Sequence, residues 1–239
     1  PVYTFSAKSD SASLTARDIR LAPSGVRFCA LEEGELVRVK TNLPGQFSVY
    51  NALAAISCAR LLGVSLADAA AALETAHGAK GRVEPVPTDG DYSIFIDYAV
   101  TPDAIENVLT TLRGIAPKRL VMLFGAGGDR DRKKRPIMGK LSADIADFVI
   151  VTSDNPRTEN PMSIIEEILP GVRAGKAPYK VICDRPEAIR WAIDHHEPGD
   201  VILLCGKGHE DYQIIGHEKI HMDEREIVAD YLAERAKRT

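Results

Sequence analysis

One segment of the 239-residue chain places a cation, an imidazole and a carboxylate among glycines, which suits the binding of a small charged molecule. Residues 206–210 read Gly-Lys-Gly-His-Glu and directly follow an apolar run. Glycine lets backbone groups come close to a ligand, and the Glu210 carboxylate can pair with an ammonium group. The alternative is an exposed polar turn. The position at the end of an apolar run favours the ligand site.

A second segment, residues 154–157, reads Asp-Asn-Pro-Arg. Asn155 precedes a proline, which biases it toward an extended backbone, so that Asn155 and Arg157 can present donors together. An amide beside a guanidinium suits a carboxylate or the charged head of an amino acid. The same segment is also compatible with a turn that leads into the next helix and leaves Arg157 in solvent.

A third segment, residues 125–130, reads Gly-Ala-Gly-Gly-Asp-Arg and lies between an apolar run and a helical pattern. Such a loop can bring backbone N–H groups up to an anion, but it can equally be a plain turn. It lacks the spacing of the dinucleotide fingerprint and of the lysine-bearing nucleotide loop. Arg130 favours anion binding because its guanidinium is a fixed, fork-shaped donor.

The elements around these segments predict an α/β fold. From residue 92 onward, apolar runs alternate with helical patterns, which predicts a Rossmann-like, mostly parallel sheet flanked by helices. The predicted strands are residues 92–97, 120–124, 148–152, 180–183 and 201–205, and the predicted helices are residues 102–115, 135–146, 161–169, 186–195 and 223–236. Asp97 ends a predicted strand, and the three segments each follow one. Because ligands bind at the carboxyl ends of parallel strands, we expect these residues to converge on one edge of the sheet.

The amino-terminal part has a different order of elements. Short β-like runs are predicted at residues 2–5, 19–22, 26–30 and 36–40, followed by helices at residues 49–62 and 66–75, with Ser65 capping the second helix. The glycine- and proline-rich stretch 78–90 is the expected boundary, which gives domains at residues 1–84 and 90–239. Because the chain opens on Pro1 inside an apparent strand, we expect it to be a piece of a longer protein.

Composition excludes several classes of function. The chain has 30 Lys and Arg against 34 Asp and Glu, a net charge of −4, which argues against nucleic-acid binding. The basic run 130–135 is interpreted as a solvated loop or helix start. No apolar stretch reaches the roughly 20 residues of a membrane helix, and no signal peptide is evident, so a cytoplasmic location is expected. The four cysteines lie far apart, which favours buried free thiols over disulfides or a metal site.

Taken together and in order, these segments resemble those of the Mur ligases, ATP-dependent enzymes of peptidoglycan and cell-wall biosynthesis. Within that family the likeness is greatest to members that add meso-2,6-diaminopimelate to UDP-MurNAc-L-Ala-D-Glu. The matching segments are residues 50–55, 81–84, 97–99, 101–103, 127–131, 134–136, 154–158 and 206–213.

The resemblance implies a division of labour within a larger enzyme. Residues 1–84 resemble the last part of the family's central ATP-binding domain, and residues 90–239 resemble the complete C-terminal domain that receives the amino acid. The phosphate loop and the ligands for Mg²⁺ lie upstream in the family, so ATP and Mg²⁺ are expected as cofactors of the full-length enzyme. The isolated chain is expected to be inactive and to need the missing N-terminal part.

By resemblance, Arg130, Asn155, Arg157, Gly206 and Glu210 bind diaminopimelate. Diaminopimelate differs from lysine by one distal carboxylate, which Arg157 can accept, while Glu210 and the Gly206 carbonyl hold the ammonium. A buried Arg157 without its anion would penalise lysine by several kcal/mol, in line with the roughly 2–5 kcal/mol cost of truncating a buried charge pair.

The resemblance also implies nucleotide contacts for Asn51, Arg82 and Asp97. One position departs from the family pattern, because Val100 stands where the family usually has a histidine. Two other functions stay open. The chain can be a non-catalytic amino-acid-binding module, or part of a related ligase that adds lysine or, more distantly, of a folate-type ligase that adds glutamate. Arg157 argues against the lysine-adding enzyme.

Overall fold

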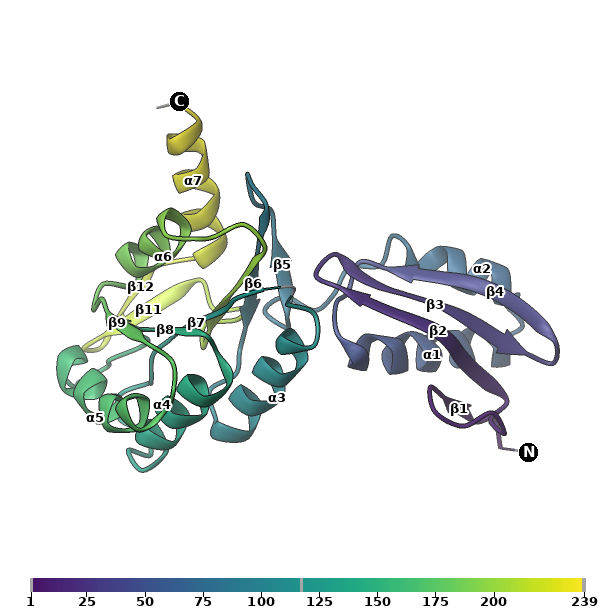
Figure 1. The fold of residues 1–239 in the computed structure, drawn as a ribbon, viewed down its shortest axis with the longest axis horizontal. Coiled ribbons are helices and arrows are strands. Elements are labelled where there is room, and N and C mark those ends of the chain that lie inside the picture. The colour runs from purple at the N-terminus through teal and green to yellow at the C-terminus, as the bar shows by residue number, and fades with distance from the viewer. Residues whose placement is uncertain (1, 117, 238–239) are drawn as a thin grey trace. The chain divides into compact units, whose positions relative to one another are not determined.

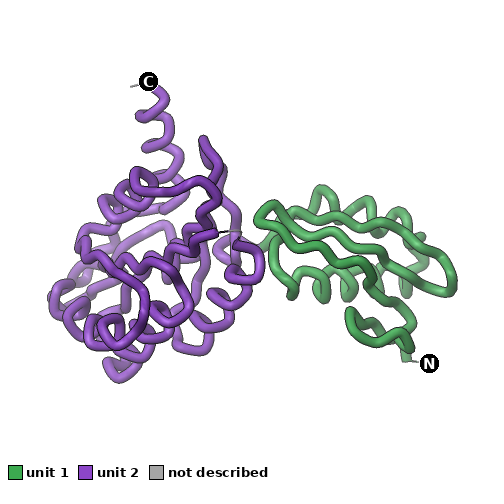
Figure 2. Tube along the Cα trace, in the orientation of Figure 1, with its two compact units in different colours: residues 1–78 green, residues 79–239 purple. Residues whose placement is uncertain are grey.

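The computed structural model describes residues 2–116 and 118–237, which fold into two compact units that divide between Gly78 and Ala79 (Figure 2). Each unit has its own sheet and helices (Figure 1). The division lies at the start of the glycine- and proline-rich stretch.

The first unit is a four-stranded sheet with two helices. Its elements are β1 (Phe5–Ser6), β2 (Leu14–Ala22), β3 (Gly25–Glu32), β4 (Glu35–Thr41), α1 (Gln46–Leu61) and α2 (Leu66–Leu73). The strand order is β1-β2-β3-β4, with β1 parallel to β2 and the other neighbours antiparallel. β2 begins earlier than predicted because a bulge between Arg17 and Arg20 interrupts its alternation.

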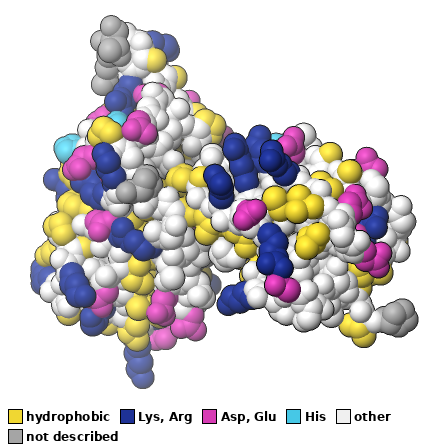
Figure 3. Space-filling view, turned by 45° about the vertical axis from the view of Figure 1, so that its right-hand side comes forward, with side chains coloured by type: hydrophobic (Ala, Val, Ile, Leu, Met, Phe, Trp, Pro, Cys, Tyr) yellow, Lys and Arg dark blue, Asp and Glu magenta, His cyan; other side chains and the backbone are white. Residues whose placement is uncertain are grey.

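The two faces of this sheet differ in character. One face is apolar and packs on the helices, where Leu53 of α1 and Leu66 of α2 are fully buried. Ser65 caps α2 by accepting the Asp68 amide, as predicted. On the other face Arg20, Arg27 and Lys40 are neighbours across three strands and all are exposed. Figure 3 shows Lys and Arg side chains gathered on this unit.

The second unit is built on a six-stranded sheet. Its strands are β5 (Glu84–Val86), β6 (Tyr92–Asp97), β7 (Leu120–Phe124), β8 (Phe148–Val151), β9 (Tyr179–Val181) and β10 (Asp200–Cys205), with a separate hairpin of β11 (Tyr212–Ile215) and β12 (Glu218–His221). Its helices are α3 (Pro102–Arg113), α4 (Lys134–Ile145), α5 (Pro161–Ala174), α6 (Arg185–Asp194) and α7 (Glu224–Ala236). The strand order is β5-β6-β10-β7-β8-β9, parallel throughout except for β5.

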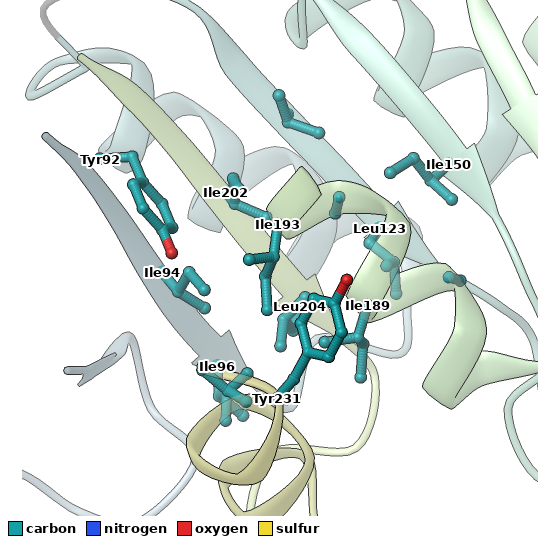
Figure 4. Close-up of a cluster of buried hydrophobic side chains, with 14 residues drawn as sticks. Tyr92, Ile94, Ile96, Leu123, Ile150, Ile189, Ile193, Ile202, Leu204 and Tyr231 are labelled. Atoms are coloured by element: carbon teal, nitrogen blue, oxygen red, sulfur yellow. The ribbon is translucent and has the colours of Figure 1, made fainter. Parts of the chain in front are cut away.

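Helices cover both faces of this sheet, which confirms the predicted α/β class. α3, α4 and α5 lie on one side and α6 and α7 on the other (Figure 1). On the α6 and α7 side, alternate strand residues such as Ile94, Leu123 and Ile202 pack against Ile189 of α6 and Tyr231 of α7 (Figure 4). Burial of both faces explains why β7 and β8 are apolar along their whole length and why β6 and β10 are mainly apolar.

Helix α5 is longer than predicted, and at Gly171 it lies unusually close to α4. The predicted end of the helix 161–169 is wrong, because α5 continues through Pro170 to Ala174. Proline costs a helix one hydrogen bond, and here the helix is stabilised by burial of Ile168 and Val172. The next residue, Gly171, lies against α4, where an added Cβ would overlap the carbonyl oxygen of Pro136. Glycine is therefore what allows α4 and α5 to approach at this point.

Some expectations from the sequence needed correction. The strand β5 and the β11–β12 hairpin were not predicted, because they are short and none of their residues is fully buried. All four cysteines are free, but only Cys205 is buried, and Cys58 is exposed on α1. In the part of the chain that the structure describes, no helix is long and apolar enough to cross a membrane.

Candidate functional site

The loops that follow β6, β7, β8 and β10 meet around one cavity of about 130 Å³. Its lining includes all five residues expected to bind an amino acid: Arg130, Asn155, Arg157, Gly206 and Glu210. Tyr98, Val100, Lys134 and Asp154 line the cavity as well. Segments far apart in the sequence therefore converge at the carboxyl edge of the sheet, as the strand-end argument predicts.

Position 206 requires glycine both for its backbone conformation and for the small space around it in the cavity. Its φ is +114°, and an added Cβ would lie 2.6 Å from the Asp154 Oδ2 atom. Its N–H donates to the Asp97 carbonyl oxygen at 2.9 Å, which joins the ends of β10 and β6. Only glycine fits this conformation without strain.

Asn155, Lys207 and Glu210 form a hydrogen-bonded group that we call the Asn155 cluster. The Lys207 Nζ donates to the Asn155 Oδ1 at 2.7 Å and to the Glu210 Oε2 at 3.0 Å. The Asn155 Nδ2 donates to the same Glu210 oxygen at 2.9 Å. The Ile214 N–H also donates to the Asn155 Oδ1, which fixes the orientation of the amide.

The environment keeps Glu210 ionised. Burial alone would raise the pKa of Glu210. The hydrogen bonds from Asn155 and Lys207 outweigh this effect of burial, so the pKa of Glu210 is lowered. The interpretation of residues 206–210 as an exposed polar turn is wrong for two of its members, since Lys207 is fully buried and Glu210 is half-buried. Only His209 of the three polar side chains is exposed.

Arg157 is held by its backbone beside the β11–β12 hairpin. Its φ is +51°, its N–H donates to the Ile214 carbonyl, and its carbonyl accepts the Gly216 N–H. The Nη1 atom donates to the Gly128 carbonyl at 2.8 Å, while Nε and Nη2 have no hydrogen-bond partner within the described ranges. The guanidinium therefore keeps donors for an anion.

Arg157 is half-buried rather than buried, which corrects the expected penalty against lysine. Water can reach a half-buried guanidinium that lacks its anion. The cost is then closer to the roughly 1.5–3 kcal/mol of a hydrogen bond to a charged group than to that of a fully buried ion.

Two more cations border the cavity. Arg130 is exposed, and its Nη1 donates to the Asp129 carbonyl. The Lys134 Nζ donates to the Val100 carbonyl at 2.8 Å, and burial lowers the pKa of Lys134. Arg157 and these two cations line the same cavity as the carboxylates of Asp154 and Glu210, so the cavity offers both signs of charge to one ligand.

Arg135 corrects the expectation that the basic run 130–135 is solvated. Its side chain is fully buried and pairs with Glu159 and Glu167, each at 2.8 Å. It also donates to the Gly127 carbonyl at 3.2 Å. The buried Arg135 side chain therefore holds the glycine-rich loop, residues 125–130, through the Gly127 carbonyl.

The residues expected to contact a nucleotide lie in different units. Asn51 is exposed on α1 of the first unit, whereas Arg82 and Asp97 belong to the second. The Arg82 guanidinium lies 5.6 Å from the centre of the Tyr98 ring. Their nucleotide role stays a prediction.

Asp97 has contacts that the sequence did not indicate. It is buried, and its two carboxylate oxygens accept the N–H groups of Val83 and Ala99, each at 2.8 Å. Burial raises the pKa of Asp97, although both backbone donors act against this. In the structure this carboxylate joins the backbone just before β5 to the backbone just after β6.

The sequence analysis noted Lys207 only as a cation of the 206–210 segment, and it gave neither Lys207 nor Lys134 a role in the site. The spacing of Lys207 and Glu210, three residues apart on one turn after a strand, was the available signal. No signal of that kind marked Lys134. Within the described ranges, no three His, Cys, Asp or Glu side chains are grouped so that they could hold a metal ion.

Comparison with known families decides the assignment of the chain. The family model described as Mur ligase, glutamate ligase domain, matches residues 81–208, more than half of the chain, and that of the Mur ligase middle domain matches residues 1–59. The chain belongs to the Mur ligase family. The C-terminal match spans Arg130, Asn155, Arg157 and Gly206 and ends just before Glu210.

Individual Mur ligases are similar over nearly the whole chain. It is 49% identical over 236 residues to the UDP-N-acetylmuramoyl-L-alanyl-D-glutamate–2,6-diaminopimelate ligase of Caldanaerobacter subterraneus subsp. tengcongensis, covering 99% of this chain and 48% of the relative. A solved structure of an enzyme with the same name superposes with a TM-score of 0.81 at 34% identity, over 98% of this chain and 48% of that one.

A more distant structure shares the fold alone. The MurF ligase of Thermotoga maritima in complex with ADP superposes with a TM-score of 0.62 at 17% identity, covering 98% of this chain and 49% of that one. The chain thus spans about half the length of the curated relatives that it matches.

Proposed function

We propose that this chain is the carboxyl-terminal part of a Mur ligase that adds meso-2,6-diaminopimelate to UDP-MurNAc-L-Ala-D-Glu in peptidoglycan biosynthesis. The observation that carries the proposal is one cavity lined both by Arg157, whose Nε and Nη2 have no partner among the described residues, and by the ionised Glu210. The names of the similar ligases support it.

The cavity matches the far end of diaminopimelate, which carries a carboxylate and an ammonium on one carbon. Arg157 donates to the carboxylate through Nε and Nη2, with Arg130 adding positive charge at the rim. Glu210 and the Gly206 carbonyl receive the ammonium, and Asn155 orients Glu210. Lysine has the ammonium and lacks the carboxylate, so it leaves Arg157 without an anion.

Binding the far end in this way leaves the near amine of diaminopimelate to react. The γ-phosphoryl group of ATP passes to the D-glutamyl carboxylate to form an acyl phosphate. The near amine then attacks the acyl carbon, phosphate leaves, and an amide bond forms. The contribution of this chain is to orient the amine, since a held nucleophile gains from proximity.

The nucleotide is proposed to contact Asn51, Arg82 and Asp97, and the ADP in the T. maritima ligase agrees with a nucleotide site in this fold. We assign the first unit to the end of the central ATP-binding domain and the second to the C-terminal domain. The phosphate loop and the Mg²⁺ ligands are assigned to the missing amino-terminal part. A cytoplasmic location follows from the use of ATP and a UDP-linked substrate.

The test is an assay of the longer protein that contains this chain. With ATP, Mg²⁺ and UDP-MurNAc-L-Ala-D-Glu, we expect ADP release and a tripeptide product, measured by mass spectrometry, with meso-diaminopimelate. With lysine we expect at least about tenfold lower kcat/KM. Equal use of lysine would assign the chain to a lysine-adding ligase, and absence of product with either amino acid would favour a non-catalytic binding module.

A further inference from the structure

A buried ion pair lies outside the cavity and next to two of the loops that form it. Arg185 is the first residue of α6 and Glu224 the first residue of α7, and the Nε and Oε1 atoms lie 2.8 Å apart. Both side chains are essentially without exposed surface. Neither residue lines the cavity.

The rest of the Arg185 guanidinium holds two backbone carbonyls. Its Nη1 donates to the Ser153 oxygen at 3.2 Å, and its Nη2 donates to the Cys205 oxygen at 2.8 Å. Ser153 immediately precedes Asp154, and Cys205 immediately precedes Gly206, so both bonds fix peptide units that enter the cavity lining. β8 and β10 are not neighbours, since β7 lies between them. One guanidinium therefore sets the spacing of two separate loops.

Both loops are held by further hydrogen bonds, one on the Cys205–Gly206 peptide unit and one on the unit that follows Ser153–Asp154. The Cys205–Gly206 unit donates its N–H to the Asp97 carbonyl at 2.9 Å, opposite the bond from Arg185. The Asp154 carbonyl accepts from the Gln213 side chain at 2.6 Å. With Arg185 in place, little freedom is left to the loops that carry Asn155 and Lys207.

We propose that Arg185, held in place by Glu224, is a positioning residue for the amino-acid cavity. This rests on the proposed function for the identity of the ligand. The fold has little need of the charges, because a buried ion pair gives no more stability than well-packed apolar residues of similar volume. The planar fork, in contrast, can reach a carboxylate and two carbonyls at once, which neither lysine nor an apolar side chain can do.

The experiment compares two variants of the 239-residue chain with a matched control. R185M/E224M removes both charges together, so that no buried charge is left unpaired, and R185K keeps the positive charge but loses the fork. The control is R190K, an exposed position on the same helix. Each protein is measured for its melting temperature, for meso-diaminopimelate affinity by calorimetry, and for amide exchange at residues 153–157 and 205–208.

For R185M/E224M and R185K we expect folded proteins whose dissociation constant for diaminopimelate is raised about tenfold or more, with faster amide exchange in both loops and R190K unchanged. Folded variants that bind as the parent does would overturn the proposal, as would loss of folding in both variants, which would make the pair structural. If the parent itself does not bind diaminopimelate, the proposed function fails. Amide exchange then decides the positioning role without a ligand, since unchanged exchange in both loops contradicts it.

Discussion

The Lys207 side chain has no exposed surface, and Asn155 and Glu210 accept its hydrogen bonds. The Asn155 cluster therefore couples the charge state of Glu210 to a lysine that cannot reach solvent. An ammonium ligand adds a second cation to the same carboxylate, and this works only while Glu210 stays ionised.

Lys207→Met is expected to move the pH dependence of ligand binding. In the parent the pKa of Glu210 is lowered, so diaminopimelate affinity should be constant from neutral pH down to about pH 5. Without Lys207 the effect of burial prevails and the pKa of Glu210 rises. Affinity should then begin to fall at a higher pH, as measured by calorimetric titration between pH 8 and pH 5.

Lys219→Met is the matched control, because Lys219 also lies near the Tyr212 ring but is exposed on β12. Its pH profile should match that of the parent. A Lys207→Met profile that coincides with both would show that Lys207 does not set the charge of Glu210.

Residue types in the cavity were predictable from sequence, and burial was not. Asn155, Arg157 and Glu210 stood out because each lies just after an apolar strand. Whether a nearby cation is solvated depends on partners elsewhere in the chain. Lys207 pairs with a residue 52 positions away and Arg135 with one 24 positions away. No local pattern encodes such pairs.

At the scale of elements, Arg135 joins the start of α4 to the loop before α5 and to α5 itself. Its two partners are Glu159, in that loop, and Glu167, on α5. Hydrogen bonds from the Arg135 guanidinium and from the Asp129 N–H lower the pKa of Glu159 to about 2. This carboxylate thus stabilises the folded state only while it is ionised.

The stability of the chain should therefore depend on pH in the acid range. A carboxyl group with a lowered pKa contributes fully above its unfolded value, near 4.5, and loses that contribution as the pH falls toward 2. In Glu159→Gln, urea unfolding followed by circular dichroism should show lower stability at pH 7. It should also show a shallower decline between pH 4.5 and pH 3.

Glu166→Gln, on the exposed side of α5, supplies the comparison. It should keep the parent's stability at pH 7 and the parent's slope in acid. An unchanged slope in Glu159→Gln would mean that other carboxyl groups govern the acid transition.

Elements were predicted best where burial is most complete. β6, β7, β8 and β10 begin and end within one residue of prediction, because strands covered on both faces are apolar throughout. β5 contains Pro85, and the two four-residue strands of the β11–β12 hairpin show no regular alternation of polar and apolar residues. The hairpin nonetheless matters, since its Ile214 contacts both Asn155 and Arg157.

At the scale of the whole molecule, the cavity exists because a parallel sheet gathers the ends of distant strands. The crossing that places β10 between β6 and β7 brings Gly206 beside Asp97 and Asp154. The sequence predicted this convergence from the order of strands and helices. It did not predict the buried Arg185, whose partners on α7, on β10 and in the loop after β8 become neighbours only in the fold.

The central claim is that this cavity holds the carboxylate and ammonium of one amino acid, and calorimetric titration of the 239-residue chain tests it most directly. The parent and Arg157→Ala are titrated with meso-diaminopimelate and with lysine. We predict that the parent binds diaminopimelate roughly 10- to 100-fold more tightly than lysine, the effect of one hydrogen-bonded charge, and that Arg157→Ala loses this preference. Equal affinities in the parent, or a preference that survives in Arg157→Ala, would contradict the account.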